Sequence, residues 1–204
     1  SKVWINGKLV KEHFGGFLPV IANITEYLHY GQDNVIAVWA DNSNDPSYPP
    51  GKPQEALDFT YFGGIYRDCW LIAHNDIFLT DPNYENETAG GGLFVSFNHV
   101  SEQSADIKLN AHIRNMSGKS FSGKVEYQLF NTSQKLVAQA EKAFSVSKGK
   151  ERQTSLVLHV NQPELWEPDS PTLYQLHVMI KDKAGNIIDG SVSYTHLRAH
   201  ETAA

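Results

Sequence analysis

The second half of the chain alternates apolar and polar residues with a period of two. In residues 105–113 the odd positions are apolar and the even positions are polar. This alternation places one face of a strand in a core and the other in water. Shorter apolar or alternating runs occupy residues 93–97, 125–129, 136–143, 154–160, 174–180 and 187–188. About seven short strands over roughly 100 residues predict an immunoglobulin-like β-sandwich.

The first 80 residues also indicate β structure. Asn6-Gly7 separates two apolar runs, and this dipeptide favours the type I′ turn of a hairpin. Residues 34–41 are a short apolar run, as expected of a buried strand. Residues 69–73 predict a further strand, in which we expect Cys69 to be buried. No long amphipathic helix is predicted, so the fold class is all-β.

Two polar segments divide the chain. Residues 42–53 contain four prolines and are predicted to form a long loop, because proline interrupts both helices and ladders. Residues 81–92 are polar, end in three glycines, and indicate a linker. The expected organisation is therefore a first domain at 1–80, a linker at 81–92 and a sandwich at 93–190.

Composition excludes several classes of protein. Hydrophobic residues make up 41% of the chain and charged residues 20%, which suits a packed core. The net charge of −6 argues against nucleic acid or an anionic membrane as a partner. No apolar run approaches the roughly 20 residues of a membrane helix. With Cys69 as the single cysteine, no internal disulfide is expected, and the compartment stays open, with a periplasmic or secreted bacterial protein favoured.

The C-terminal residues need a separate interpretation. Residues 192–202, VSYTHLRAHET, match the translation of a sequencing adapter, and we expect residues 191–204 to be a non-native tail. The alternative is a native last strand, since Val192 and Tyr194 alternate with polar residues. An adapter origin would mean that the natural protein is longer and differs after about Ser191.

Several short sequence motifs resemble those of family 2 glycoside hydrolases of the β-galactosidase type, and they occur in the same order as in that family. Those of the first part resemble the family's sugar-binding domain, and Gly63–Ile72 (GGIYRDCWLI) is the most specific. Those of the second part resemble its immunoglobulin-like domain. The matching segments are Val3–Lys8, Gly15–Pro19, Ile24-Thr25, Gly31, Asn34-Val35, Val38, Asp41-Asn42, Gly63–Ile72, Leu165–Tyr174 and Gly185–Asp189. The resemblance covers residues 1–190 and implies a partial, galactose-binding-like jelly roll followed by the sandwich.

The resemblance implies a retaining hydrolase whose two catalytic glutamates lie in a barrel domain outside these residues. No catalytic residue is therefore expected within this chain. Asp68 matches the family position that contacts galactosyl hydroxyls and helps to ligate a sodium ion. Asp58 matches a sugar-contacting aspartate of the related β-glucuronidases. A carboxylate suits both roles, because it accepts hydroxyl hydrogen bonds and binds hard cations.

Each candidate also has a structural interpretation. Asp68 follows Arg67, and the two side chains are compatible with an ion pair or a turn cap. Gly63-Gly64 indicates a tight turn rather than a phosphate cradle, because the P-loop lysine is absent. Tyr61 and Phe62 are candidates for stacking on sugar, whereas Trp70 is expected in the core. His196 and His200 have the i, i+4 spacing of metal ligands but lie in the expected non-native tail, and the other histidines show no ligand spacing and are expected at the surface.

We therefore expect a non-catalytic piece of a glycosidase that acts on terminal β-galactosides or related β-glycosides. It would position the substrate and brace the barrel. The expected partners are a β-galactoside or oligosaccharide, the barrel of the same chain, and further copies in a homo-oligomer. The alternatives are a stand-alone carbohydrate-binding or adhesion module and a purely structural pair of domains. The sequence leaves the sugar, its linkage and the oligomeric state open.

Overall fold

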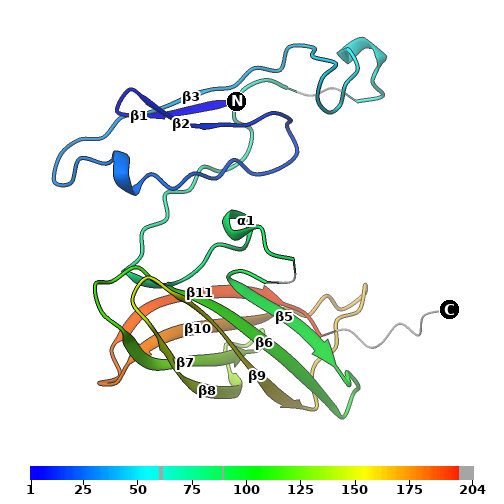
Figure 1. Cartoon of the computed structure of the whole chain (residues 1–204). Coiled ribbons are helices and arrows are strands. Elements are labelled where there is room, and N and C mark those ends of the chain that lie inside the picture. Colours follow the sequence, from blue (N-terminus) through cyan, green and yellow to red (C-terminus); the bar gives the residue numbers. More distant parts are fainter. Residues whose placement is uncertain (60–61, 89, 198–204) are drawn as a thin grey trace. The chain divides into compact units, whose positions relative to one another are not determined.

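The computed structural model describes residues 1–59, 62–88 and 90–197, and strands make up most of its regular structure (Figure 1). The chain divides into two compact units between Ile72 and Ala73. Among these described residues, no helix is long and apolar enough to cross a membrane. The prediction of an all-β fold is confirmed.

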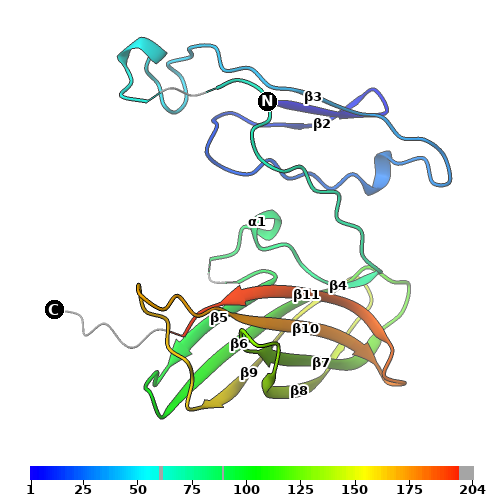
Figure 2. The ribbon, with the colours of Figure 1, turned by 180° about the vertical axis from the view of Figure 1, so that it is seen from behind.

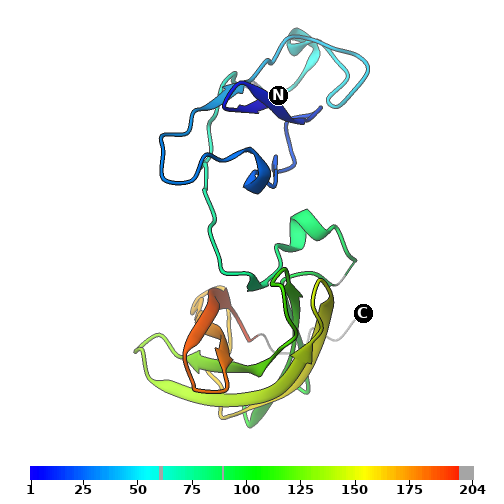
Figure 3. The ribbon, with the colours of Figure 1, turned by 60° about the vertical axis from the view of Figure 1, so that its left-hand side comes forward.

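The second unit is a sandwich of two antiparallel sheets, which face one another in Figure 3. In one sheet, β6 (Ser104–Asn115) pairs along one edge with β9 (Glu151–Asn161). The other edge of β6 pairs with two strands, first with β5 (Leu93–Asn98) and, further along β6, with β4 (Ile77–Leu79).

The second sheet of the sandwich has the order β11-β10-β7-β8. Its strands are β7 (Phe121–Phe130), β8 (Leu136–Val146), β10 (Tyr174–Asp182) and β11 (Ile187–Thr195). Figure 2 shows β4 beside β11, where the backbone N–H of Leu79 donates to Asp189 Oδ2 over 2.8 Å.

The core of the sandwich follows the alternation of the sequence. With the exception of Leu197, which follows β11, its fully buried side chains come from every second residue of the paired strands, because neighbouring side chains of a strand point to opposite faces. The largest members are Tyr127, Tyr174, Ile107, Leu109, Ile113, Leu129, Leu176, Ile180 and Leu197. Tyr174 accepts a 2.7 Å hydrogen bond from the backbone of Glu164, whereas burial alone raises the pKa of Tyr127. This core supplies most of the hydrophobic stabilisation of the unit.

The first unit contains a three-stranded antiparallel sheet with the order β2-β1-β3. The strands are β1 (Lys2–Ile5), β2 (Lys8–Glu12) and β3 (Ile36–Trp39), and two 3-10 turns lie at Thr25–Tyr27 (η1) and Gln54–Ala56 (η2). Asn6 and Gly7 have φ of 51° and 79°, which confirms the predicted hairpin turn. Ile5 is the one buried hydrophobic side chain among the described residues of this unit.

The predicted strand at residues 69–73 is wrong. These residues are not in a strand, Cys69 is exposed, and Trp70 is 81% exposed. A strand requires a neighbour that pairs with its N–H and C=O groups, and no described strand lies along this segment. The expectations of a buried Cys69 and a core-packed Trp70 are therefore wrong as well.

The division into units differs from the expected boundaries. Residues 77–79 form β4 of the sandwich, although they were expected in the first domain. The segment 81–92 belongs to the second unit, where it contains α1 (Pro82–Glu85). Hydrogen bonds and ion pairs connect this segment to the sandwich, so it is not a flexible linker.

The C-terminal residues continue the sandwich as far as they are described. β11 runs to Thr195 beside β10, and Leu197 is fully buried. The backbone N–H of Trp166 donates to Leu197 O over 2.5 Å. Residues 198–204 lie outside the described part of the chain. The non-native origin of residues 191–204 stays a prediction, while 191–195 occupy a strand position.

Truncation of a core side chain tests the sandwich. Leu176→Ala removes a fully buried side chain and is expected to lower the free energy of unfolding by about 2–5 kcal/mol. Leu173→Ala is the matched control, because Leu173 is 44% exposed, and its effect is expected to be much smaller. Urea denaturation followed by circular dichroism measures both. Equal losses for the two variants would contradict this core.

Candidate functional site

The segment Gly63–Asp68 begins with a tight turn of the backbone. Gly64 has φ of +86°, where a side chain would be strained. A Cβ at Gly63 would lie 2.9 Å from Asn42 Oδ1, so the absence of a side chain lets the loop at 42–53 approach this turn. The predicted interpretation of Gly63-Gly64 as a backbone turn is supported, and Asp68 follows this turn in the chain.

Asp41 and Asp45 form local hydrogen bonds at the start of the loop at 42–53. Asp41 Oδ1 accepts hydrogen bonds from the hydroxyl and backbone N–H of Ser43, and these lower the pKa of Asp41. The hydroxyl and backbone of Ser47 lower the pKa of Asp45 in the same way. These local bonds hold the start of the loop in turns.

Asp58 and Asp68, the two predicted sugar-contacting carboxylates, are both exposed. Within the described part of the chain, neither forms an ion pair or accepts a hydrogen bond. Arg67 lies over the ring of Tyr66, with 5.9 Å between its Cζ and the ring centroid, instead of pairing with Asp68. Both carboxylates are therefore available as hydrogen-bond acceptors for a ligand.

Exposed aromatic rings accompany these carboxylates along the chain. Phe62 is 78% exposed and Tyr66 is 70% exposed, while Tyr61 lies outside the described residues. Exposed rings beside hydrogen-bond acceptors have the chemical character of a sugar-binding surface, because a sugar presents both apolar C–H groups and hydroxyls.

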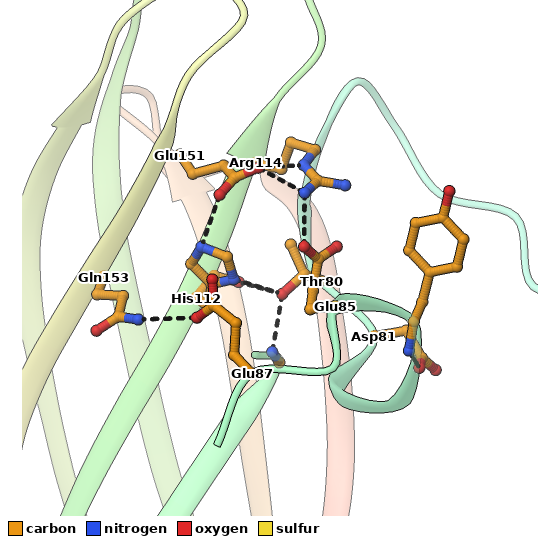
Figure 4. A network of polar contacts seen from close by, with 10 residues as sticks. Thr80, Asp81, Glu85, Glu87, His112, Arg114, Glu151 and Gln153 are labelled. Carbon is orange, nitrogen blue, oxygen red and sulfur yellow. Dashed lines mark hydrogen bonds and ion pairs between the residues drawn. The ribbon is translucent and has the colours of Figure 1, made fainter. Parts of the chain in front are cut away.

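A second polar cluster lies on the outer face of the sandwich (Figure 4). From β6, Arg114 Nε donates to Glu151 Oε1 of β9 over 2.9 Å, and its Nη2 donates to Glu85 Oε2 of α1 over 2.6 Å. The hydrogen bond from Arg114 lowers the pKa of Glu151. Asp81 caps α1 by accepting from the backbone of Asn83 and Tyr84, so the helix turn forms and presents Glu85.

His112 occupies the centre of this cluster and is only 3% exposed. Its Nε2 lies 3.2 Å from Glu151 Oε2, and its Nδ1 lies 2.9 Å from Thr80 Oγ1. Thr80 Oγ1 also accepts a 2.8 Å hydrogen bond from the backbone of Gly92. The expectation that His112 is a surface residue is wrong, because the segment from Thr80 to Gly92 covers it.

The three glycines at 90–92 were the sequence signal for this covering segment. A Cβ at Gly92 would lie 2.7 Å from Pro82 Cδ and 2.8 Å from Thr80 O, so only glycine permits this approach. The alternation of β6 predicts that position 112 faces outward, and it does. What alternation does not reveal is that another segment packs over that outward face.

Glu85, His112 and Glu151 place three potential metal-ligand atoms within 4.8 Å of one another. Arg114, however, already donates to both carboxylates and supplies the positive charge between them. A metal ion would have to displace this guanidinium. The cluster is therefore best explained as an ion-pair network that fastens α1 to the sandwich.

The antiparallel sheets of the two units define the chain as an all-β protein. Residues 92–198 match Glycosyl hydrolases family 2, which is more than half of the chain. The chain is 30% identical to a β-galactosidase of Thermoanaerobacter pseudethanolicus, with 98% of this chain covered. It is also 30% identical to a β-glucuronidase of Bacteroides fragilis, with 99% covered. The chain belongs to glycoside hydrolase family 2.

Solved structures agree with this assignment. Bacteroides uniformis β-glucuronidase 2 superposes with a TM-score of 0.80 at 30% identity, over 96% of this chain and 23% of that protein. A putative β-galactosidase of Bacteroides fragilis gives a TM-score of 0.82 at 26% identity, over 100% of this chain and 29% of that protein. The chain spans 25% and 28% of the two sequence relatives named above, so it corresponds to about a quarter of such proteins.

Removing Arg114 tests the network. Arg114→Met removes the guanidinium from Glu85 and Glu151 and is expected to destabilise the chain at neutral pH by about 1–3 kcal/mol. Since the pKa of Glu151 is lowered in the folded state, its contribution is present above the ordinary glutamate pKa. It is lost as the pH falls through the lowered value, so the difference between wild type and variant should shrink in acid.

Urea titrations between neutral and acidic pH measure this difference. Lys124→Met is the matched control, because Lys124 pairs with Glu141 on an exposed face and its loss should leave the unfolding midpoint nearly unchanged. A pH-independent difference for Arg114→Met would show that lost packing, and not the ion pair, explains the effect.

Proposed function

We propose that residues 1–204 are a non-catalytic part of a retaining glycoside hydrolase that acts on terminal β-galactosides or related β-glycosides. The first unit contributes substrate contacts through Asp68, with a lesser contribution from Asp58. The sandwich braces a catalytic barrel that lies outside these residues. The two glutamates of retaining hydrolysis belong to that barrel, so the chain alone is expected to be inactive.

The observation that supports this proposal best is that the Asp68 carboxylate is exposed and forms no ion pair within the described part of the chain. Asp68 follows the turn at Gly63-Gly64 and is not used by Arg67. A purely structural aspartate would be expected to cap a turn or to pair with a cation. An unpaired carboxylate has two oxygens that accept hydrogen bonds from neighbouring sugar hydroxyls.

The relatives are named as β-galactosidases and β-glucuronidases, so a neutral and an acidic sugar are both candidates. Asp68 matches the position that contacts galactosyl hydroxyls, which favours a galactosyl group, whereas Asp58 matches a contact of the β-glucuronidases and does not separate the two sugars. We therefore propose that the parent enzyme prefers β-galactosides to β-glucuronides.

A sodium ion is part of the same proposal. Asp68 has the hard oxygen atoms that such an ion prefers. The acidic and histidine side chains described around it form no three-ligand group, because the one such group is the sandwich cluster of Glu85, His112 and Glu151. Asp68 would thus supply one ligand, and the remaining oxygens would come from other parts of the enzyme or from the substrate.

A stand-alone carbohydrate-binding module is the second candidate. The observation that favours it is the set of exposed rings, which includes Phe62 and Tyr66. The two proposals differ in what the isolated chain does. A self-contained module binds galactose or lactose by itself, whereas a pocket wall completed by a barrel binds them weakly or not at all.

Asp68→Asn in the parent enzyme tests the substrate contact. Loss of a charged acceptor is expected to lower kcat/KM for an aryl β-galactoside by about 10- to 100-fold, as expected for a hydrogen bond to a charged group. The melting temperature should not change, because no described residue depends on Asp68. Asp33→Asn, another exposed aspartate of the same unit, is the matched control and should retain full activity.

Two further measurements separate the alternatives. Replacing sodium with potassium should lower the activity of the wild type more than that of Asp68→Asn, if Asp68 ligates the ion. Calorimetric titration of residues 1–204 with lactose should give no measurable heat. Tight binding by the isolated chain would instead support the stand-alone module, and full activity of Asp68→Asn would exclude the proposed contact.

A further inference from the structure

Asn42 lies three residues after the end of β3, at the centre of a tight turn. β3 ends at Trp39 and pairs along its length with β1, so the chain leaves this sheet at a defined point. Asp41 Oδ1 then accepts hydrogen bonds from the backbone N–H and the hydroxyl of Ser43. This Asx turn holds the backbone on both sides of Asn42, so the point from which its side chain departs is fixed.

The side-chain amide of Asn42 lies against the backbone of Gly63. A Cβ added to Gly63 would be 2.9, 3.2 and 3.4 Å from the Oδ1, Cγ and Nδ2 atoms of Asn42. These distances are shorter than an ordinary van der Waals contact, so the amide packs this closely only against a residue without a side chain. Gly63 is not in the left-handed region, unlike Gly64. The contact with Asn42, and not the backbone conformation, is therefore what favours glycine at position 63.

The loop that begins at Asn42 is held at its ends and in its middle. The backbone N–H of Gln54, which follows the loop, donates to Asn44 Oδ1 over 3.1 Å. The ring of Tyr48, in the middle of the loop, lies 5.4 Å from the ring of Phe14 between their centroids. Contacts of this kind reduce the number of conformations that a loop adopts. Asn42 therefore belongs to a supported segment, against which the turn at Gly63 can rest.

Only a short piece of chain separates this turn from the candidate sugar contact. Asp68 comes four residues after Gly64, so their Cα atoms are at most about 14 Å apart. A change in the position of the turn is therefore transmitted to the Asp68 carboxylate. Such changes matter for catalysis, because a misplacement of about 1 Å can lower a rate about 100-fold.

We propose that Asn42 is a positioning residue for substrate binding. Its amide holds the turn at Gly63-Gly64 against the start of the loop at 42–53, and this contact determines where the Asp68 carboxylate meets the sugar. Asn42 acts through Asp68 and does not have to touch the substrate. The inference rests on the proposed role of Asp68, and it gives the long loop at 42–53 a part in the same site.

A double-mutant cycle in the parent enzyme tests the proposal. Asn42→Ala is expected to lower kcat/KM for an aryl β-galactoside by about tenfold, because a displaced carboxylate stabilises the transition state less. In an Asp68→Ala background the same change should cost less than about twofold, because the group that Asn42 positions is already absent. A residue with a merely structural role would cost the same in both backgrounds.

Gly63→Ala tests the contact from its other side, because the added methyl group displaces the Asn42 amide. It should lower kcat/KM about as much as Asn42→Ala, and the two changes together should cost no more than either one alone. Gly118→Ala is the matched control, since a Cβ at that position meets no atom within 4 Å, and it should retain full activity. The melting temperature of each variant shows whether a loss of activity comes from unfolding.

Three results would overturn the positioning role alone. They are full activity of Asn42→Ala and Gly63→Ala beside an impaired Asp68→Ala, equal losses from Asn42→Ala in the two backgrounds, and unfolding of both variants at the assay temperature, which would show a structural role instead. Full activity of Asp68→Ala would exclude the proposed function itself, and the positioning role with it. The two failures are therefore distinguishable.

Discussion

The structure depends on one constraint, which is that every β-strand needs a neighbour for its backbone and a cover for its apolar face. The sandwich meets both requirements. β6 is paired along both edges, and β7 and β10 are internal strands of the facing sheet. Their alternate side chains form one closed core, with Ile107, Leu109 and Leu176 fully buried. The unit can therefore present polar groups on its outside without weakening its inside.

The first unit has the same kinds of residue but meets the constraint only in part. Its three strands bury Ile5, while β3 and the segment around Trp70 remain exposed. This difference is not one of propensity, because Ile36–Trp39 is as apolar and β-branched as the strands of the sandwich. It is a difference in the number of neighbouring strands. A surface of this kind is suited to further contacts, and it lies in the same unit as the exposed carboxylates of Asp58 and Asp68.

The network around Arg114 shows that polar side chains can also cover the outer face of a strand. The outer face of β6 would otherwise be open to water, but the segment from Thr80 to Gly92 packs over it. Thr80, His112 and the backbone of Gly92 satisfy one another, and Arg114 balances the carboxylates of Glu85 and Glu151. This cluster resembles a metal site, but its cation is the guanidinium of Arg114. It is therefore an ion-pair network that holds α1 against the sandwich.

The sequence by itself determined the local features of this protein. Period-two alternation identified the strands of the sandwich and the residues of its core, Asn6-Gly7 identified the first hairpin, and Gly63-Gly64 identified a turn. Each of these depends on backbone geometry within a few residues. The family resemblance carried by Gly63–Ile72 and Leu165–Tyr174 was likewise visible in the sequence, and it selected Asp68 and Asp58 as candidate sugar contacts.

Only the tertiary structure decided which apolar and polar residues are covered. Trp70 and Cys69 had a strand pattern but no neighbouring strand among the residues that the structure describes, so they are exposed. His112 had an outward position but lies beneath a segment that begins 32 residues earlier in the chain, so it is buried. The end of the first unit at Ile72 also followed from contacts, because β4 pairs with β6. Pairing and covering join residues that are distant in sequence, and a local pattern does not specify those partners.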